Sequence, residues 1–297
     1  MKDCSSKTAL TIDAMIICFN RQSELNLAID SCKVPSVHHV HVLDNASELP
    51  ISVRPEVSLI RSSENLGPCN GRNTLAQQSS ADLLLFLDDD AVIDIDTDIA
   101  GLIDAFSSNE NLSIIAGLVR REDGHIAKLE FPSRTVKEVF KSREVGYFVE
   151  GACIIRRSDF VNLGGYDGNF FYGHEATDFA LRLAASGKQI IYDPRLSFVH
   201  RPSSLGRSLT SEKYVRQMRN RRILTWRNLP RPIALLHVSI WLIFYMTRIW
   251  KRRPSDFLRL IKAAILPVAE QERLIKRRPL PYRELNRLQK SGYRIYW

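Results

Sequence analysis

Residues 83–90 have the sequence LLLFLDDD, in which five apolar residues lead directly into three aspartates. A short apolar run bounded by polar residues is typical of a strand buried on both faces, as in a parallel sheet covered by helices. Ligands of such sheets bind beyond the carboxyl ends of the strands. Three adjacent carboxylates repel one another, and Mg²⁺ or Mn²⁺ would relieve the repulsion while holding a diphosphate. The stretch therefore predicts a metal and phosphate site, with a solvated acidic turn as the alternative.

The sequence on both sides of this strand alternates between apolar runs and amphipathic stretches. We expect strands at 12–18, 39–43, 57–61, 83–87, 113–118 and 151–155, and helices at 21–32, 68–79, 100–106 and 176–186. This alternation predicts an α/β domain over residues 1–205, built on a mostly parallel, Rossmann-like central sheet. The polar segment 122–144 is expected to be a hairpin or a loop.

Charge is divided unevenly along the chain. Residues 201–297 contain 23 Lys and Arg but only 5 Asp and Glu, whereas the whole chain of 297 residues has a net charge of +9. This basic region is expected to be helical over residues 206–297 and to face an anionic partner surface. No nucleic-acid-binding motif is visible in it, so we expect a membrane and no nucleic acid as partner.

One stretch of the basic region, residues 233–250, is almost entirely apolar. Its roughly 15 uncharged residues fall short of the ~20 that a membrane-spanning helix needs. Arginine and lysine flank it on both sides, which favours a helix lying in the interface of an anionic membrane. A helix packed on the preceding domain and a spanning helix are the alternatives.

The cysteines and the first residues bear on the compartment. Five cysteines are scattered along the chain without a CxxC pair, and residues 1–10 lack the apolar core of a signal peptide. Both features favour a reducing compartment. We therefore expect a cytoplasmic protein that is peripheral on the inner face of the cell membrane.

Three further groups of polar residues lie where a ligand would bind. Asp44 directly follows the second strand, and the turn at 65–73 offers backbone N–H groups and Arg72 to anionic oxygens. Glu175 and Asp178 are spaced to share one helix face, so one of them could act as a general base. The alternative for this pair is an ordinary acidic first turn.

Histidines give a weaker signal. His200 ends the strand expected at 196–199 and could be a third metal ligand, although a lone histidine is more often structural. The run of histidines at 38, 39 and 41 has strand alternation and no carboxylate close by in sequence, so we expect it on the surface.

Taken in order, these motifs resemble those of the family 2 glycosyltransferases with the GT-A fold, particularly the bacterial rhamnosyltransferase-like branch. The resemblance extends from residue 12 to about residue 226 and rests on the order and spacing of the motifs. They are IICFNR (16–21), LDNAS (43–47), the turn at 65–73, LDDD (87–90), EGA (150–152), GGYD (164–167), the helix at 175–182, DP (193–194) with VH (199–200), and MRNR (218–221).

The resemblance implies that an acceptor hydroxyl attacks the anomeric carbon of a UDP- or dTDP-sugar with inversion, assisted by Mg²⁺ or Mn²⁺. The acceptor would be a glycan or a lipid-linked acceptor. Asp44 would recognise the nucleotide base and Asp88 would lie by the ribose. The implied donor-binding residues are Asn20, Asp44, Arg72 and Asp88, and the implied metal ligands are Asp88, Asp90 and His200.

One position departs from the family pattern. Many relatives carry Asp directly after the Glu of the helix motif, and the base is often assigned to it, but Ala176 stands here. Glu175 is therefore the first candidate for the base and Asp178 the second. A catalytically inactive, membrane-associated sugar-binding protein is an alternative that Ala176 favours and the intact Asp88–Asp90 opposes. A GT-A-like nucleotidyltransferase is another, opposed by the lack of glycine in Phe19–Arg21.

Overall fold

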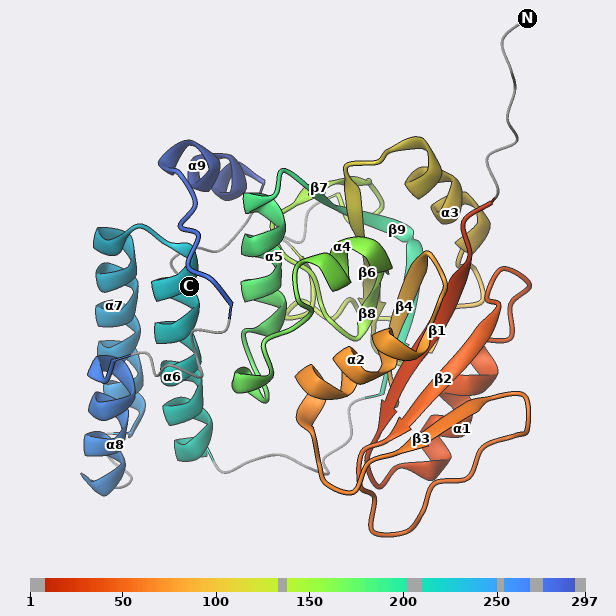
Figure 1. Cartoon of the computed structure of the whole chain (residues 1–297), viewed down its shortest axis with the longest axis horizontal. Helices are drawn as coiled ribbons and strands as arrows, with labels where there is room; N and C mark the ends of the chain where they lie inside the picture. The colour runs from red at the N-terminus through yellow and green to blue at the C-terminus, as the bar shows by residue number, and fades with distance from the viewer. Residues whose placement is uncertain (1–8, 133–137, 202–209, 250–253, 268–274, 292–297) are drawn as a thin grey trace, which may run out of the picture.

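The computed structural model describes residues 9–132, 138–201, 210–249, 254–267 and 275–291. A nine-stranded sheet runs through the molecule with helices on both faces, and the C-terminal helices are stacked against one side (Figure 1). The expected α/β class is confirmed. The boundary expected between residues 205 and 206 lies outside the described residues.

The first half of the sheet is parallel and contains the strand that decides the fold. Strands β1 (Ile12–Cys18), β2 (His39–Asp44), β3 (Ser58–Arg61) and β4 (Leu83–Asp88) lie in the order β3-β2-β1-β4. Cys18 on β1 pairs with Asp44, and Ile17 pairs with Asp88. This register places Asp44 and Asp88 at the same edge of the sheet, as the sequence predicted.

The second half of the sheet is mixed. Its strands are β5 (Ala91–Ile93), β6 (Leu112–Arg120), β7 (Arg143–Val145), β8 (Ala152–Arg156) and β9 (Gln189–His200). Strand β8 is antiparallel to both β4 and β6, so its first residues meet the last residues of β4. The antiparallel pairing of β9 with β5 brings His200 opposite Ala91. Both pairings place residues from later in the chain close to the three aspartates.

Helices cover both faces of the sheet because alternate residues of its central strands point to opposite sides. In β4, Leu84 and Phe86 belong to one core cluster and Leu85 to the other. Helices α1 (Gln22–Ser31) and α3 (Ile99–Ser108) cover the Leu85 face. Helices α2 (Gly67–Gln78) and α5 (Glu175–Ala185) cover the other, with α4 (Arg157–Asn162) and the short 3₁₀ helix η1 (Gly168–Phe170) nearby.

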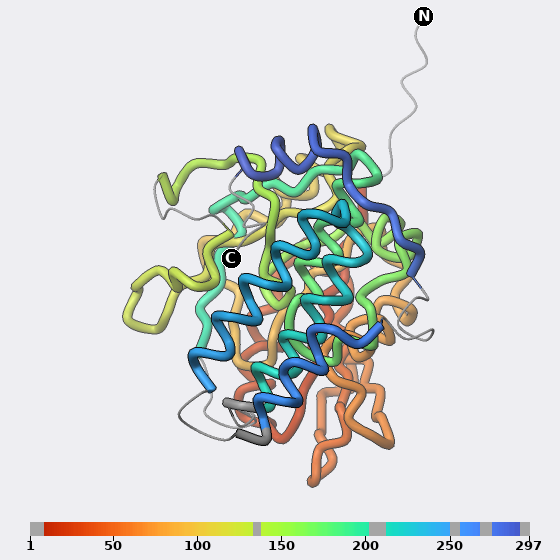
Figure 2. Tube along the Cα trace, turned by 90° about the vertical axis from the view of Figure 1, so that its left-hand side faces the viewer, coloured from red at the N-terminus to blue at the C-terminus, as the bar shows by residue number. Residues whose placement is uncertain are grey.

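In the described part of the C-terminal region, four helices follow the sheet domain. They are α6 (Thr210–Asn228), α7 (Arg231–Ile249), α8 (Pro254–Ile265) and α9 (Tyr282–Lys290). Helix α6 contacts α5, and α7 and α8 pack on α6 around Met218, Tyr245 and Leu260. Figure 2 shows α7 and α8 outermost on this side. Among the described residues, only α7 is long and apolar enough to cross a membrane, with a mean hydropathy of 1.5 and 17% of its apolar window buried. The basic residues 251–253 that follow it lie outside the described residues.

The prediction for the early histidines was wrong at one position. His41 is buried in β2, and its Nε2 lies 3.2 Å from Oδ2 of Asp13 on the neighbouring strand. Ser79 donates a second hydrogen bond to the same carboxylate oxygen. The pair therefore helps to hold β1 and β2 together at the edge opposite the aspartates.

Candidate active site

Asp88 lies at the carboxyl end of β4 with its side chain 39% exposed. Arg72, buried in α2, donates a hydrogen bond from Nη2 to Asp88 Oδ1 at 2.6 Å. The carbonyl of Gly151 accepts a hydrogen bond from the backbone N–H of Asp88. A Cβ on Gly151 would lie 2.1 Å from that carboxyl group, so only glycine leaves Asp88 its space here.

Asp89 and Asp90 turn toward the loop after β1. Arg21 Nη1 lies 2.8 Å from Asp89 Oδ1 and 2.9 Å from Asp90 Oδ2. Burial raises the pKa of Asp89 to about 6. The negative charges of Asp90 and Asp88 raise it as well, and the positive charge of Arg21 offsets these effects only in part. Arg21 and Arg72 therefore supply part of the positive charge needed to offset the repulsion among the three aspartates.

His200 bridges Asp90 to a residue that the sequence did not reveal. Its Nε2 lies 3.3 Å from Asp90 Oδ1, and its Nδ1 lies 2.8 Å from Glu130 Oε2. Burial alone would lower the pKa of His200, but the hydrogen bonds to Asp90 and Glu130 raise it to about 9. Glu130 lies in the irregular segment 70 residues before His200, so no local pattern pointed to it.

The residues at this edge fit a divalent ion that arrives with a diphosphate. Among the described parts of the chain, no three acidic, cysteine or histidine side chains are arranged to enclose a metal. Mg²⁺, however, is usually held by one or two carboxylates together with substrate phosphates. Asp90 and His200 are already in contact, and Glu130 fixes the second ring nitrogen of His200 as carboxylates commonly do behind metal ligands. Asp88 is directed to Arg72 instead.

The predicted nucleotide-binding residues Asn20 and Asp44 shape the loops beside this edge. Asp44 is buried, and its carboxylate accepts hydrogen bonds from the backbone of Ser47 and Ile51 and from Arg61. Burial opposes ionisation of Asp44, but these donors lower its pKa below the ordinary value. Asn20 adopts a left-handed conformation, with φ of 58°, and its Oδ1 accepts from the backbone N–H of Glu48.

The two candidate bases on α5 differ sharply in their surroundings. Glu175 is only 1% exposed, and neither of its carboxylate oxygens accepts a hydrogen bond from a donor in the described residues. Burial and the nearby Glu150 raise its pKa well above the ordinary value. Ala176 beside it is buried in the core. Glu150 itself, in the loop before β8, is half-buried.

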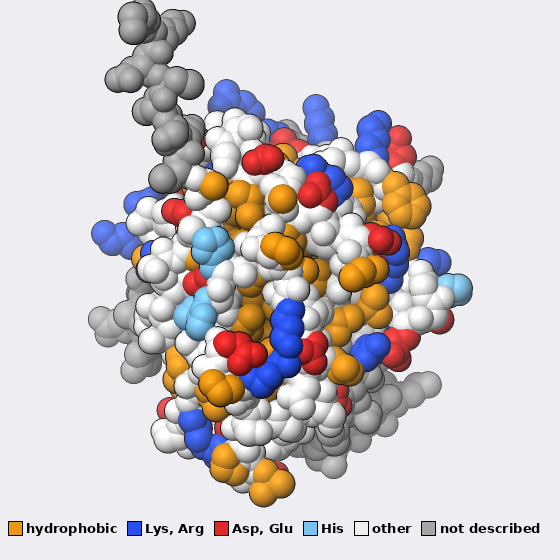
Figure 3. Space-filling view, turned by 90° about the vertical axis from the view of Figure 1, so that its right-hand side faces the viewer, with side chains coloured by type: hydrophobic (Ala, Val, Ile, Leu, Met, Phe, Trp, Pro, Cys, Tyr) orange, Lys and Arg blue, Asp and Glu red, His pale blue; other side chains and the backbone are white. Residues whose placement is uncertain are grey.

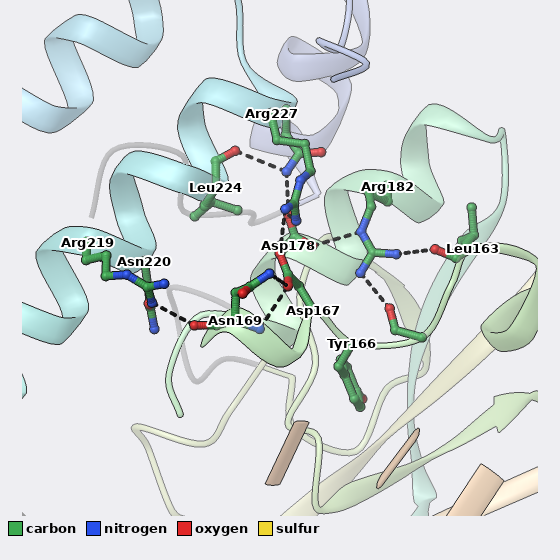
Figure 4. A network of polar contacts seen from close by, with 12 residues as sticks. Leu163, Tyr166, Asp167, Asn169, Asp178, Arg182, Arg219, Asn220, Leu224 and Arg227 are labelled. Atoms are coloured by element: carbon green, nitrogen blue, oxygen red, sulfur yellow. Dashed lines mark hydrogen bonds and ion pairs between the residues drawn. The ribbon is translucent and has the colours of Figure 1, made fainter. Parts of the chain in front are cut away.

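Asp178 is completely buried and has three donors around it. They are Nε of Arg182 at 2.8 Å, Nη1 of Arg227 at 2.9 Å and Nδ2 of Asn228 at 2.7 Å. Figure 4 shows Asp178 enclosed between Arg182 on its own helix and Arg227 on α6. Both carboxylate oxygens of Asp178 therefore already accept hydrogen bonds from protein donors, which makes Asp178 a poor acceptor for a substrate proton.

Helix α6 also holds the segment that leads into Glu175. The side-chain amide of Asn220 donates to the carbonyls of Phe170, Tyr172 and Gly173, at 2.8 to 3.2 Å. Arg219 donates to the carbonyl of Asn169 at 2.6 Å, as Figure 4 shows. In the sequence, the MRNR motif (218–221) was the signal for these contacts, and no role was predicted for it.

Comparisons with known proteins agree with this geometry. The family model described as glycosyl transferase family 2 matches residues 13–164. Rhamnosyltransferase WbbL of Escherichia coli is 27% identical over 119 residues, which span 38% of this chain but only 44% of that protein.

Two solved structures share the fold at low sequence identity. Mannosyltransferase PcManGT of Pyrobaculum calidifontis, in complex with GDP-Man and Mn²⁺, is 15% identical with a TM-score of 0.55, covering 96% of this chain and 85% of its own. Residues 1–349 of TarS from S. aureus, in complex with UDP-GlcNAc, are 13% identical with a TM-score of 0.59, covering 94% and 84%.

Proposed function

The chain belongs to glycosyl transferase family 2, and from this premise we propose that it transfers a sugar with inversion from a nucleotide-sugar donor to an acceptor hydroxyl, assisted by a divalent ion. The observation that carries the proposal is the arrangement at the end of β4. There, Asp90 lies against His200, and Asp88 lies against the buried Arg72. Carboxylates, an imidazole and buried guanidinium groups at one sheet edge suit a metal-bound diphosphate.

A UDP- or dTDP-sugar is the proposed donor. PcManGT and TarS were each crystallised with a nucleotide sugar, which supports this class of donor for the shared fold. Asn20 and Asp44 border the proposed base pocket, and Asp88 with Arg72 would meet the ribose and the phosphate side of the donor. Because Asp44 is held by three donors of its own chain, its role would be to shape this pocket as much as to contact the base.

Asp90 and His200 are the proposed protein ligands of Mg²⁺ or Mn²⁺, with Asp88 close by. When bound, the ion would neutralise charge on the departing diphosphate. Arg21 already forms ion pairs with Asp89 and Asp90, so part of the negative charge at this edge is offset before a donor binds. Glu130 would keep the ring of His200 oriented through Nδ1.

The acceptor is proposed to be a glycan or lipid-linked sugar at an anionic membrane surface. The outward face of α7 is apolar and exposed, with Leu235 and Ile243 exposed by 70% and 63%. Trp241 instead faces inward, with Arg221 stacked 3.4 Å from its ring centroid. Arg231 and Arg248 lie near the two ends of the helix, where they suit anionic head groups.

The opposite side of the molecule differs from this apolar, arginine-flanked helix. Figure 3 shows Lys and Arg interspersed with Asp and Glu there, with no large field of one sign. This contrast supports docking through α7, and we propose that the protein is peripheral on the inner face of the cell membrane.

A thermal-shift panel tests the donor proposal directly. UDP-, dTDP- and GDP-sugars should raise the melting temperature more with Mn²⁺ than with EDTA, because the ion and the diphosphate bind together. No shift with any donor would contradict the proposal. The inactive sugar-binding alternative, which Ala176 favours, predicts the same shift without release of nucleoside diphosphate.

A further inference from the structure

We propose that Glu150 is the catalytic base of this transferase and that the buried Glu175 is the positioning residue that orients it. The inference rests on the proposed sugar transfer and names the group that takes the proton.

Glu150 lies beside the proposed donor site. The next residue, Gly151, accepts a hydrogen bond from the backbone of Asp88 and packs directly against its carboxyl group. The antiparallel pairing of β8 with β4 fixes this neighbourhood, since Ala152 pairs with Leu87. Glu150 is half-buried, so it is not sealed in the core as Glu175 is.

Glu175 cannot meet an acceptor in the same way. Its carboxyl group is shielded from solvent, with no donor from the described residues on either oxygen. A buried carboxylate without donors is costly, whereas a protonated carboxyl group needs only an acceptor. The raised pKa of Glu175, caused by burial and by Glu150, agrees with a proton that stays on Glu175 and points to Glu150.

Arg72 ties this acid pair to the donor site. Its guanidinium is buried and interacts electrostatically with Asp88, Glu150 and Glu175. One of its nitrogens, Nη1, has no hydrogen-bond partner among the residues that the structure describes. The single positive charge of this arginine cannot balance Asp88, Glu150 and Glu175 together, which agrees with a proton on the more deeply buried Glu175.

The other carboxylates of this region are committed elsewhere. Asp178 is surrounded by Arg182, Arg227 and Asn228. Asp167 accepts from Arg227 Nη2 at 2.5 Å. Position 176 offers only the methyl group of a buried alanine. Within the described part of the chain, Glu150 is half-buried and its carboxylate is not enclosed by arginine and amide donors in this way.

The proposed step balances as follows. The acceptor oxygen forms a bond to the anomeric carbon while the bond from that carbon to the diphosphate oxygen breaks, and the electron pair of that bond leaves with the nucleoside diphosphate. The hydroxyl proton passes to Glu150, which later releases it to solvent. Glu175 keeps its own proton and donates a hydrogen bond to Glu150 throughout.

Two isosteric substitutions separate the roles. Glu150→Gln removes the proton acceptor, so release of nucleoside diphosphate should fall by roughly 10²-fold or more, while binding of UDP or dTDP with Mn²⁺ stays unchanged. In Glu175→Gln the amide N–H can still donate to Glu150, so release should stay within about 10-fold of the wild type. The control is Glu110→Gln, exposed near the start of β6 at the opposite edge of the sheet.

The probes are UDP-GlcNAc, GDP-mannose and dTDP-rhamnose, with water as the acceptor. Activity of Glu150→Gln equal to that of Glu110→Gln would overturn the inference, as would a Glu175→Gln variant as impaired as Glu150→Gln. A wild-type protein that cleaves none of the donors would count against the proposed function itself. Infrared spectroscopy then decides the pairing: the carbonyl band of a protonated carboxyl group at neutral pH should vanish in Glu175→Gln. Its absence from the wild type would overturn the inference.

Discussion

Nη1 of Arg227 lies 2.9 Å from Oδ1 of Asp178, and both side chains are completely buried. The same guanidinium contacts Asp167 through Nη2. Because Arg227 is on α6 and Asp178 is on α5, these ion pairs join the basic C-terminal region to the helix that begins with Glu175.

Replacing Arg227 by Met should strongly destabilise the protein. The change leaves Asp167 and Asp178 buried without their main counter-charge, and breaking a buried pair in this way costs on the order of 3–5 kcal/mol. Urea unfolding followed by circular dichroism measures the loss. Arg283→Met, at an exposed position on α9, is the matched control and should change the free energy of unfolding by less than about 0.5 kcal/mol. Equal losses in the two variants would contradict this role of Arg227.

Asn220→Ala should loosen the segment that precedes Glu175. The carbonyls of Phe170, Tyr172 and Gly173 lose their shared donor, which costs roughly 1–3 kcal/mol when buried groups stay unsatisfied. Hydrogen exchange followed by mass spectrometry should accelerate over residues 170–175 and much less elsewhere in the sheet domain. Asn286→Ala, exposed on α9, provides the comparison. Unchanged exchange over 170–175 would argue against anchoring by α6.

The described cysteines should resist thiol reagents in the folded protein. Cys18, Cys32, Cys69 and Cys153 are free and buried. Burial raises the pKa of Cys18 and Cys32 to about 12, so almost none of either thiol is ionised at neutral pH. Iodoacetamide labelling with peptide mapping should modify these four only after unfolding in guanidinium. Rapid modification of any of them in the native protein would show that the thiol is accessible.

The outward face of α7 should determine binding to anionic vesicles. Basic residues near such a surface contribute about 1 kcal/mol each, and salt screens this attraction while sparing the apolar contribution. Sedimentation with anionic liposomes should therefore weaken at high salt but persist. The double variant Leu235→Ser/Ile243→Ser should lose the salt-resistant fraction. The matched control is Leu49→Ser/Ile95→Ser, which changes two highly exposed apolar side chains on the sheet domain. Equal binding by both double variants would exclude α7 as the docking face.

The sequence was most informative where a single strand carried the signal. The apolar run before Asp88 predicted a strand buried on both faces, and β4 has this character because helices cover both sides of the sheet. The order of strands and helices gave the α/β class for the same reason. The shared edge of Asp44 and Asp88 followed from parallel pairing alone.

Contacts between residues far apart in the chain could not be predicted from the sequence. Glu130 meets His200 across 70 residues, and His41 meets Asp13 across 28, so no local periodicity reveals either contact. The antiparallel pairing of β8 with β4 brings Glu150 close to Asp88. This pairing depends on the path of the irregular segment before β8. Two of the three partners of Asp178, Arg227 and Asn228, likewise come from α6, about 50 residues later in the chain.

Release of nucleoside diphosphate by wild-type protein and by Asp90→Asn, each with Mn²⁺ and with EDTA, tests metal-assisted sugar transfer most directly. Asp90→Asn keeps the size of the side chain but removes the charge proposed to hold the ion. With UDP-GlcNAc, GDP-mannose and dTDP-rhamnose as probes, we expect the wild type to cleave at least one donor with Mn²⁺ and to lose that activity in EDTA. Asp90→Asn should remain folded and lose the Mn²⁺-dependent activity. Donor cleavage that is equal in EDTA, or an Asp90→Asn variant as active as the wild type, would contradict the account.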